Sequence, residues 1–102
     1  MKNITPEEVK QRLDAGEKLN LLDVRESYEN AEFNIGGMLV PVGNIQNMQI
    51  EEIEHLKNEE VILYCRSGNR SGIAAMILDK LGFTNTKNLV GGMLSWQQKF
   101  KH

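Results

Sequence analysis

The chain has 102 residues, of which 40% are hydrophobic and 25% are charged, and its formal net charge is −2. This size and composition predict one globular domain over residues 1–102, without an overall positive field to attract nucleic acid or an anionic membrane. No apolar stretch approaches the roughly 20 residues of a membrane span, and the N-terminus lacks the apolar core of a secretory signal. We expect a cytoplasmic protein that acts as a monomer.

The N-terminal quarter carries clear local signals. Thr5-Pro6-Glu7-Glu8 predicts a helix start, with threonine as the N-cap, proline at the first helical position and glutamate at the third. Gly16 is the expected end of this helix. Residues 19–25 then predict a short, mostly apolar strand, and residues 27–33 a single helical turn.

The middle of the chain is less regular until it reaches a strongly apolar segment. Residues 38–42 predict a second strand, whose length Pro41 limits. Residues 44–57 carry apolar side chains at roughly helical spacing, and Asn44 or Asn47 is the expected cap. Val61-Ile62-Leu63-Tyr64 is the clearest strand, and it leads directly into the chain's one cysteine.

The second half of the chain predicts a helix over residues 71–81, a last strand over 86–90 and a closing helix over 93–100. The 71–81 helix has an apolar stripe, expected to face the core and formed by Ile73, Met76, Ile77 and Leu81, with Ala74, Ala75 and Leu78 widening it. We also expect packing roles for Met38, Met48, Met93 and Trp96. Alternating strands and helices predict an α/β fold with a mostly parallel sheet.

In such sheets ligands bind beyond the carboxyl ends of the strands. Cys65 lies at one such end, and Asp23 and Arg25 lie at another. The functional interpretation of Asp23 and Arg25 is that they orient the loop after Cys65. The structural interpretation is an ion pair, with Glu29 or Glu32 as the partner of Arg25.

The segment Cys65-Arg66-Ser67-Gly68-Asn69-Arg70 joins the buried strand to a helix. The helix N-terminus, the two arginines and the loop amides would all favour a thiolate, so we expect a lowered pKa for Cys65. Gly68 can adopt a positive φ there without steric cost. The structural alternative is that Cys65 serves only as a small buried hydrophobic residue.

One cysteine and two histidines exclude an internal disulfide and a Cys/His zinc site, and we expect no metal and no cofactor. Neither His55 nor His102 is near Cys65 in sequence, so a Cys-His hydrolase fits poorly. An ionised thiolate needs no general base, which favours attack on sulfur or phosphorus over attack on an amide.

On these motifs the chain resembles a single-domain rhodanese. The similar motifs are Leu21-Leu22-Asp23-Val24-Arg25 near the N-terminus, the Cys65–Arg70 loop, and Gly91-Gly92 followed by Trp96. The resemblance implies a five-stranded parallel sheet with helices on both faces. It also implies transfer of sulfane sulfur through a persulfide on Cys65, from thiosulfate or a similar small anion to cyanide, a thiol or a partner protein. The chain departs from the family at Phe33-Asn34-Ile35-Gly36-Gly37-Met38, where a histidine and a proline are usual.

By the same resemblance, the amides of residues 66–70 would cradle the persulfide and the anionic donor, giving Arg66, Ser67, Gly68, Asn69 and Arg70 as substrate-binding residues. Arg70 closes the loop and is the expected partner of an oxyanion, whereas Arg66 points either inward or to solvent. A phosphatase or arsenate reductase needs five residues between cysteine and arginine, and this chain has four. A non-catalytic binding or regulatory module is the third alternative, and the presence of Cys65 argues against it.

Overall fold

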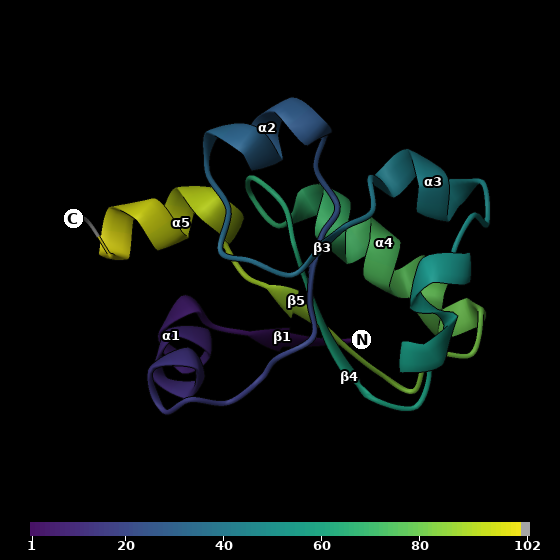
Figure 1. Cartoon of the computed structure of the whole chain (residues 1–102), viewed down its shortest axis with the longest axis horizontal. Coiled ribbons are helices and arrows are strands. Elements are labelled where there is room, and N and C mark those ends of the chain that lie inside the picture. The colour runs from purple at the N-terminus through teal and green to yellow at the C-terminus, as the bar shows by residue number, and fades with distance from the viewer. Residues whose placement is uncertain (101–102) are drawn as a thin grey trace.

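The computed structural model describes residues 1–100, which form a five-stranded parallel sheet in the order β1-β5-β4-β2-β3 with helices on both faces (Figure 1). The strands are Lys2–Ile4 (β1), Leu21–Asp23 (β2), Met38–Leu39 (β3), Glu60–Tyr64 (β4) and Asn85–Leu89 (β5). The helices are Pro6–Asp14 (α1), Ser27–Glu32 (α2), Val42–Gln46 (α3), the 3-10 helix Glu51–Leu56 (η1), Asn69–Lys80 (α4) and Gly92–Lys99 (α5). The predicted α/β class and parallel sheet are confirmed.

Each face of the sheet has its own hydrophobic core. Helices α3, η1 and α4 cover one face, and α1 and α5 cover the other. Strand β4 lies in the middle of the sheet, and its residues 61–64 are fully buried. Continuous apolar sequence is therefore required there, because both faces of the strand are covered. Trp96, predicted to pack, is 6% exposed in the core beside α1.

The start of α1 is built as its sequence predicts. Thr5 Oγ1 accepts a hydrogen bond from the Glu8 amide at 3.1 Å, and Glu8 Oε1 accepts one from the Thr5 amide at 3.4 Å. Pro6 is the first helical residue, and Gly16, at φ +86°, follows the last turn. This reciprocal capping fixes where the chain leaves β1 and enters the helix.

Four local expectations need correction. Strand β1 was absent from the sequence pattern, because two of its three residues are exposed and form no apolar run. The strand expected over 38–42 ends at Leu39, because Pro41 lacks an N–H and precedes α3.

The helix expected over 44–57 is two short helices, which are interrupted near Met48 at φ +60°. Neither Asn44 nor Asn47 is an N-cap; the N-caps are Pro41 and Ile50, and Asn47 is the C-cap of α3.

Helix α4 buries only part of the apolar stripe that its sequence predicted: Ala74, Ala75 and Leu78 are buried, and Ile77 and Leu81 pack against the same core, as expected. It starts at Asn69, and its buried residues are Ser71, Ala74, Ala75 and Leu78, at i, i+3, i+4 and i+7. Ile73 and Met76 are 45% and 55% exposed. Small side chains at 71, 74 and 75 let the helix approach the sheet closely, and this contact outweighs the burial of longer apolar side chains. The packing role expected for Met48, which is 63% exposed, is likewise wrong.

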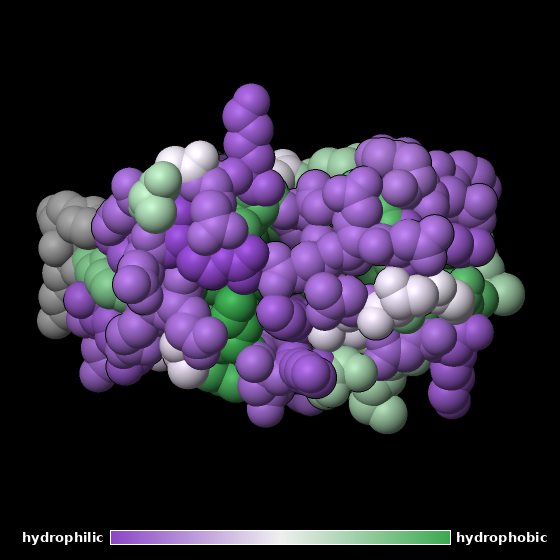
Figure 2. Space-filling view, turned by 90° about the horizontal axis from the view of Figure 1, so that it is seen from below, coloured by the Kyte–Doolittle hydropathy of each residue, from purple (hydrophilic) through white to green (hydrophobic). Residues whose placement is uncertain are grey.

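The surface seen in Figure 2 is mostly hydrophilic, with apolar residues in small separate areas. Within residues 1–100, none of the helices combines the length and the apolar content needed to cross a bilayer.

Candidate active site

Cys65 leaves the carboxyl end of β4 and turns its sulfur into the loop that precedes α4. The side chain is only 1% exposed. The backbone amides of Gly68 and Ser71 donate hydrogen bonds to Sγ at 3.1 and 3.4 Å, and the Ser71 hydroxyl oxygen lies 3.3 Å from Sγ. A sulfur surrounded by N–H and O–H groups is in a setting that favours its anionic form.

Two opposing effects act on the acidity of this thiol. Burial raises the pKa of Cys65. The loop amides, and the Ser71 hydroxyl when it donates to the thiolate, lower the pKa by more than burial raises it, so the pKa is below its ordinary value of 9.0. The predicted lowering of the Cys65 pKa is thus confirmed. Its source is mainly Ser71 and the loop amides, rather than the flanking arginines.

The start of α5 holds the cysteine loop in place through two backbone hydrogen bonds. The amides of Met93 and Leu94 donate to the carbonyl oxygens of Cys65 and Arg66, both at 2.9 Å. Gly92, at φ +55°, makes this approach possible, because a Cβ there would lie 2.4 Å from the Cys65 carbonyl oxygen. Gly68 has the expected positive φ of +98°. Two glycines therefore set the shape and position of the loop.

Sequence reasoning missed two residues of this site, Ser71 and Asn88. Asn88, on β5, accepts a hydrogen bond from the Ser71 hydroxyl at 2.5 Å and donates from Nδ2 to the Gly68 carbonyl oxygen at 3.1 Å. A polar residue in the middle of the predicted last strand, level with Leu63 of β4, was the available signal. No pattern in the sequence indicated that Asn88 would meet α4.

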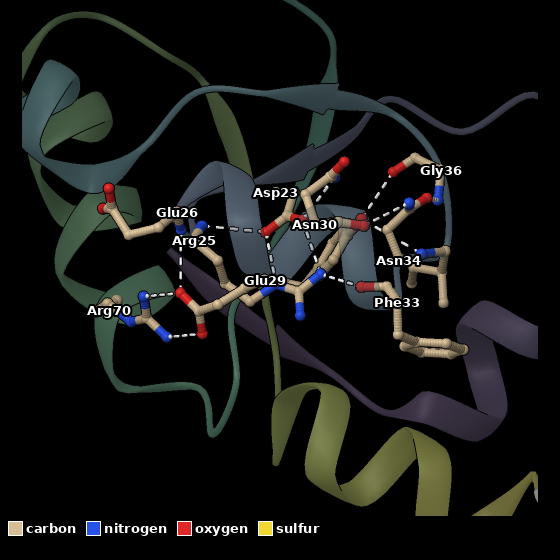
Figure 3. Close-up of polar contacts among 11 residues, drawn as sticks. Asp23, Arg25, Glu26, Glu29, Asn30, Phe33, Asn34, Gly36 and Arg70 are labelled. Carbon is tan, nitrogen blue, oxygen red and sulfur yellow. Dashed lines mark hydrogen bonds and ion pairs between the residues drawn. The ribbon is translucent and has the colours of Figure 1, made fainter.

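Arg70, expected to pair with an oxyanion, is instead paired with Glu29 of α2 (Figure 3). Its two terminal nitrogens donate to the two Glu29 oxygens at 2.8 and 2.9 Å. This ion pair lowers the pKa of Glu29 to about 2 and raises that of Arg70. The cause is geometric, because α2 lies over the same edge of the sheet as the loop (Figure 1). Glu29 gave no sign of this role in the sequence.

Asp23 and Arg25 form the structural ion pair of the second interpretation, but with each other. Arg25 Nη2 lies 2.8 Å from Asp23 Oδ2, and Arg25 Nη2 also donates to the Phe33 carbonyl oxygen at 2.6 Å. The expected partner of Arg25, Glu29 or Glu32, is therefore wrong. The pair is almost fully buried, and Asn30 of α2 donates to Asp23 as well (Figure 3). Together these contacts tie α2 to the end of β2.

The turn at 33–38, where the chain departs from the rhodanese pattern, is closed by other means. Asn34 Oδ1 accepts a hydrogen bond from the Gly36 amide at 2.9 Å. The Tyr64 hydroxyl donates to the Gly36 carbonyl oxygen at 2.8 Å, and its burial raises the pKa of Tyr64 to about 12. Asparagine and glycine thus build this turn without proline.

A pocket of about 350 Å³ lies between α2, α5 and the loop. Its walls are Arg25, Glu29, Glu32, Phe33, Arg66, Met93, Leu94 and Gln97. Arg66 is exposed and lines this pocket. Among the described residues, it has no ion-pair partner, unlike Arg25 and Arg70.

Residues 1–100 contain no group of three or more His, Cys, Asp or Glu side chains placed to hold a metal ion. His55 lies on η1, and His102 lies outside the described residues.

Known proteins are similar to this chain over nearly its whole length. A family model described as a rhodanese-like domain matches residues 5–99. "Putative sulfurtransferase YtwF" of Bacillus subtilis is 39% identical over 103 residues, which cover 99% of this chain and 95% of YtwF. "Putative sulfur carrier protein YrkF" of the same organism is 39% identical over 97 residues, which cover 94% of this chain and 51% of YrkF, so the chain spans about half of that relative. A crystal structure of a rhodanese-like domain protein from Staphylococcus aureus superposes with a TM-score of 0.81 at 30% identity, covering 94% and 91% of the two chains.

Proposed function

The chain belongs to the rhodanese-like domain family, and from this premise we propose that it is a sulfurtransferase that carries sulfane sulfur as a persulfide on Cys65. One observation carries the proposal: at a strand end, the sulfur of the chain's single cysteine lies within 3.4 Å of two backbone amides and of the Ser71 hydroxyl oxygen. Such a thiolate can attack sulfur without a general base.

The loading step needs only the thiolate and an activated donor. The Cys65 thiolate attacks the outer sulfur of thiosulfate or a similar anion, and a new Sγ–S bond forms. The donor's S–S bond breaks, and its electron pair leaves on sulfite. The negative charge then lies on the outer sulfur of the persulfide, near the amides of residues 66–70.

Discharge needs an acceptor from outside these 102 residues, because no second cysteine is present to take the sulfur. Cyanide, a small thiol or a thiol on a partner protein attacks the outer sulfur. The Sγ–S bond breaks, and its electron pair returns to Sγ as the thiolate. The pocket beside Arg66 is the proposed route for donor and acceptor, because Arg66 follows Cys65 directly in the loop; Cys65 itself is buried and is not among the residues that line the pocket.

We assign binding of the donor anion first to Arg66, and to Arg70 only secondarily. Arg66 lines the pocket without an ion-pair partner among the described residues, whereas both terminal nitrogens of Arg70 are occupied by Glu29. Ser67, Gly68 and Asn69 contribute through their backbone amides in this proposal. Asp23 and Arg25 act at a distance, by fixing α2 beside the loop.

Phosphoryl transfer is the weaker alternative for this loop. Four residues separate Cys65 from Arg70, one fewer than a phosphate-binding loop needs, and the Arg70 guanidinium points toward Glu29. A non-catalytic persulfide-binding role would keep the loading step but lose the discharge. The same proposal keeps a cytoplasmic monomer as its expectation, and light scattering after gel filtration measures the oligomeric state.

Thiocyanate formation from thiosulfate and cyanide tests the proposal. The wild-type protein should turn over, and Cys65→Ser, matched in size, should be inactive. A control with an aryl phosphate should release no phosphate. Release of phosphate without formation of thiocyanate would support the phosphatase alternative instead. A protein that gains sulfur on Cys65 but forms no thiocyanate would support the non-catalytic binding module.

A further inference from the structure

Ser71 and Asn88 form a buried polar pair against Cys65, for which the sulfur-transfer steps above give no role. Ser71 is fully buried on α4, and Asn88 is 9% exposed on β5. The Ser71 oxygen lies 3.3 Å from Cys65 Sγ and 2.5 Å from Asn88 Oδ1. One hydroxyl group therefore contacts two acceptors.

A serine hydroxyl has a single proton to donate. Two oxygen atoms 2.5 Å apart need a proton between them, so in this arrangement the Ser71 hydroxyl donates to Asn88. The orientation of the Asn88 side-chain amide is fixed, because its Nδ2 donates to the Gly68 carbonyl oxygen. Rotation would bring its own oxygen against that carbonyl. Donation to Cys65 therefore requires the Ser71–Asn88 bond to open.

We propose that Asn88 is a positioning residue that competes with the Cys65 thiolate for the single hydroxyl proton of Ser71. In the thiol form, the Cys65 S–H donates to Ser71 Oγ, and the Ser71 O–H donates to Asn88 Oδ1. When the thiol loses its proton to solvent, the Ser71 O–H turns to Sγ. Asn88 then loses a hydrogen bond, so it opposes ionisation of Cys65.

The consequence for catalysis rests on the proposed sulfur transfer. In the persulfide the charge lies on the outer sulfur, and the Ser71 hydroxyl donates to Asn88 again. When an acceptor attacks the outer sulfur, the electron pair of the Sγ–S bond moves to Sγ, and the hydroxyl turns to meet it. Ser71 thus stabilises the departing thiolate, and Asn88 limits how strongly it does so.

The charged groups around Cys65 leave a clear pH window for a test. They are Arg66 in the loop, Arg70 on α4 and Glu29 on α2. Glu29 has a pKa of about 2, and Tyr64, next to Cys65 in the chain, has one of about 12. Between these values, neither of these two groups titrates along with the thiol.

The test measures the Cys65 pKa from thiolate ultraviolet absorbance, with Cys65→Ser as the blank. Ser71→Ala should raise the pKa by about one unit, because a hydrogen bond to the anion is lost. Asn88→Leu should lower it by about half a unit, because the hydroxyl becomes free to donate to Sγ. Asn85→Leu, an exposed position on the same strand, should leave it unchanged.

The double variant Ser71→Ala/Asn88→Leu separates this proposal from a merely structural role. If Asn88 acts through Ser71, adding Asn88→Leu to Ser71→Ala changes the Cys65 pKa no further. An equal shift in both backgrounds, or a raised pKa in Asn88→Leu alone, overturns the proposal and assigns Asn88 to holding the Gly68 carbonyl.

A measurement on the unmodified protein keeps the proposal testable if Asn88→Leu does not fold. The side-chain carbonyl carbon of Asn88 should change its NMR chemical shift with the same midpoint as the Cys65 titration, and much less so in Ser71→Ala. An Asn88 signal that is constant across the wild-type titration overturns the proposal. None of these measurements uses a sulfur donor, so their failure is distinguishable from a failure of sulfur transfer.

Discussion

Replacing Gly92 by alanine tests how the start of α5 holds the cysteine loop. Gly92 lies at φ +55°, and an added Cβ would be 2.4 Å from the carbonyl oxygen of Cys65 and 2.6 Å from that of Arg66. Both neighbours are backbone atoms, which cannot swing aside as a flexible side chain can. The loop and α5 must therefore move apart in Gly92→Ala.

The cost of this movement has two parts. A side chain in the left-handed region costs about 1 kcal/mol. Separation also weakens the two hydrogen bonds from the Met93 and Leu94 amides to the loop carbonyls, each worth about 1 kcal/mol. We expect the free energy of unfolding to fall by roughly 3 kcal/mol, a large part of the stability of a small domain.

Urea unfolding followed by the fluorescence of the buried Trp96 measures this loss. Gly16→Ala is the matched control, because Gly16 has φ +86° but no atom within 4 Å of an added Cβ. It should cost only about 1 kcal/mol. Equal losses of unfolding free energy in Gly92→Ala and Gly16→Ala would refute the close approach between α5 and the loop.

Three further predictions concern charged residues. The Glu29–Arg70 ion pair should contribute its full stabilisation above the ordinary Glu29 pKa of 4.5 and lose it as the pH falls toward about 2. In a plot of unfolding free energy against pH, Glu29→Gln should therefore flatten the acid side. An acid side that is the same in both proteins contradicts this prediction. Asp23→Asn should lower the urea-unfolding free energy by roughly 3 kcal/mol, because it leaves the buried Arg25 charge uncompensated, and a loss under about 1 kcal/mol argues against this pairing. Arg66→Ala should raise the KM for thiosulfate several-fold more than Arg70→Ala, and the reverse order would assign the anion to Arg70.

The sequence predicted those parts of the fold that local patterns specify. The apolar run at 61–64, the Thr5 capping box and the single cysteine at a strand end each depend on neighbouring residues, and all three are confirmed. Strand β1 has no such pattern, because its hydrogen bonds to β5 come from a segment more than 80 residues away. Pairing at that distance depends on the backbone and leaves little trace in side-chain type.

The polar contacts of the site were the least predictable part. The sequence indicated charges at the right strand ends, but Glu29 proved to be the partner of Arg70 and not of Arg25. Which carboxylate meets which guanidinium depends on how α2 sits over the sheet, and a one-residue rotation of a helix changes the answer. Asn88 meets Ser71 for a similar reason, since β5 and α4 come together only in the folded sheet.

The most direct test of the central claim is the intact mass of the protein through one cycle of sulfur loading and release. After incubation with thiosulfate and removal of excess donor, we predict one added sulfur atom per chain, located on Cys65 and absent from Cys65→Ser. Addition of cyanide should restore the original mass and form an equal amount of thiocyanate. A folded protein that gains no sulfur from thiosulfate or other sulfane donors, with its thiol intact, would contradict the assignment of Cys65 as a sulfur carrier.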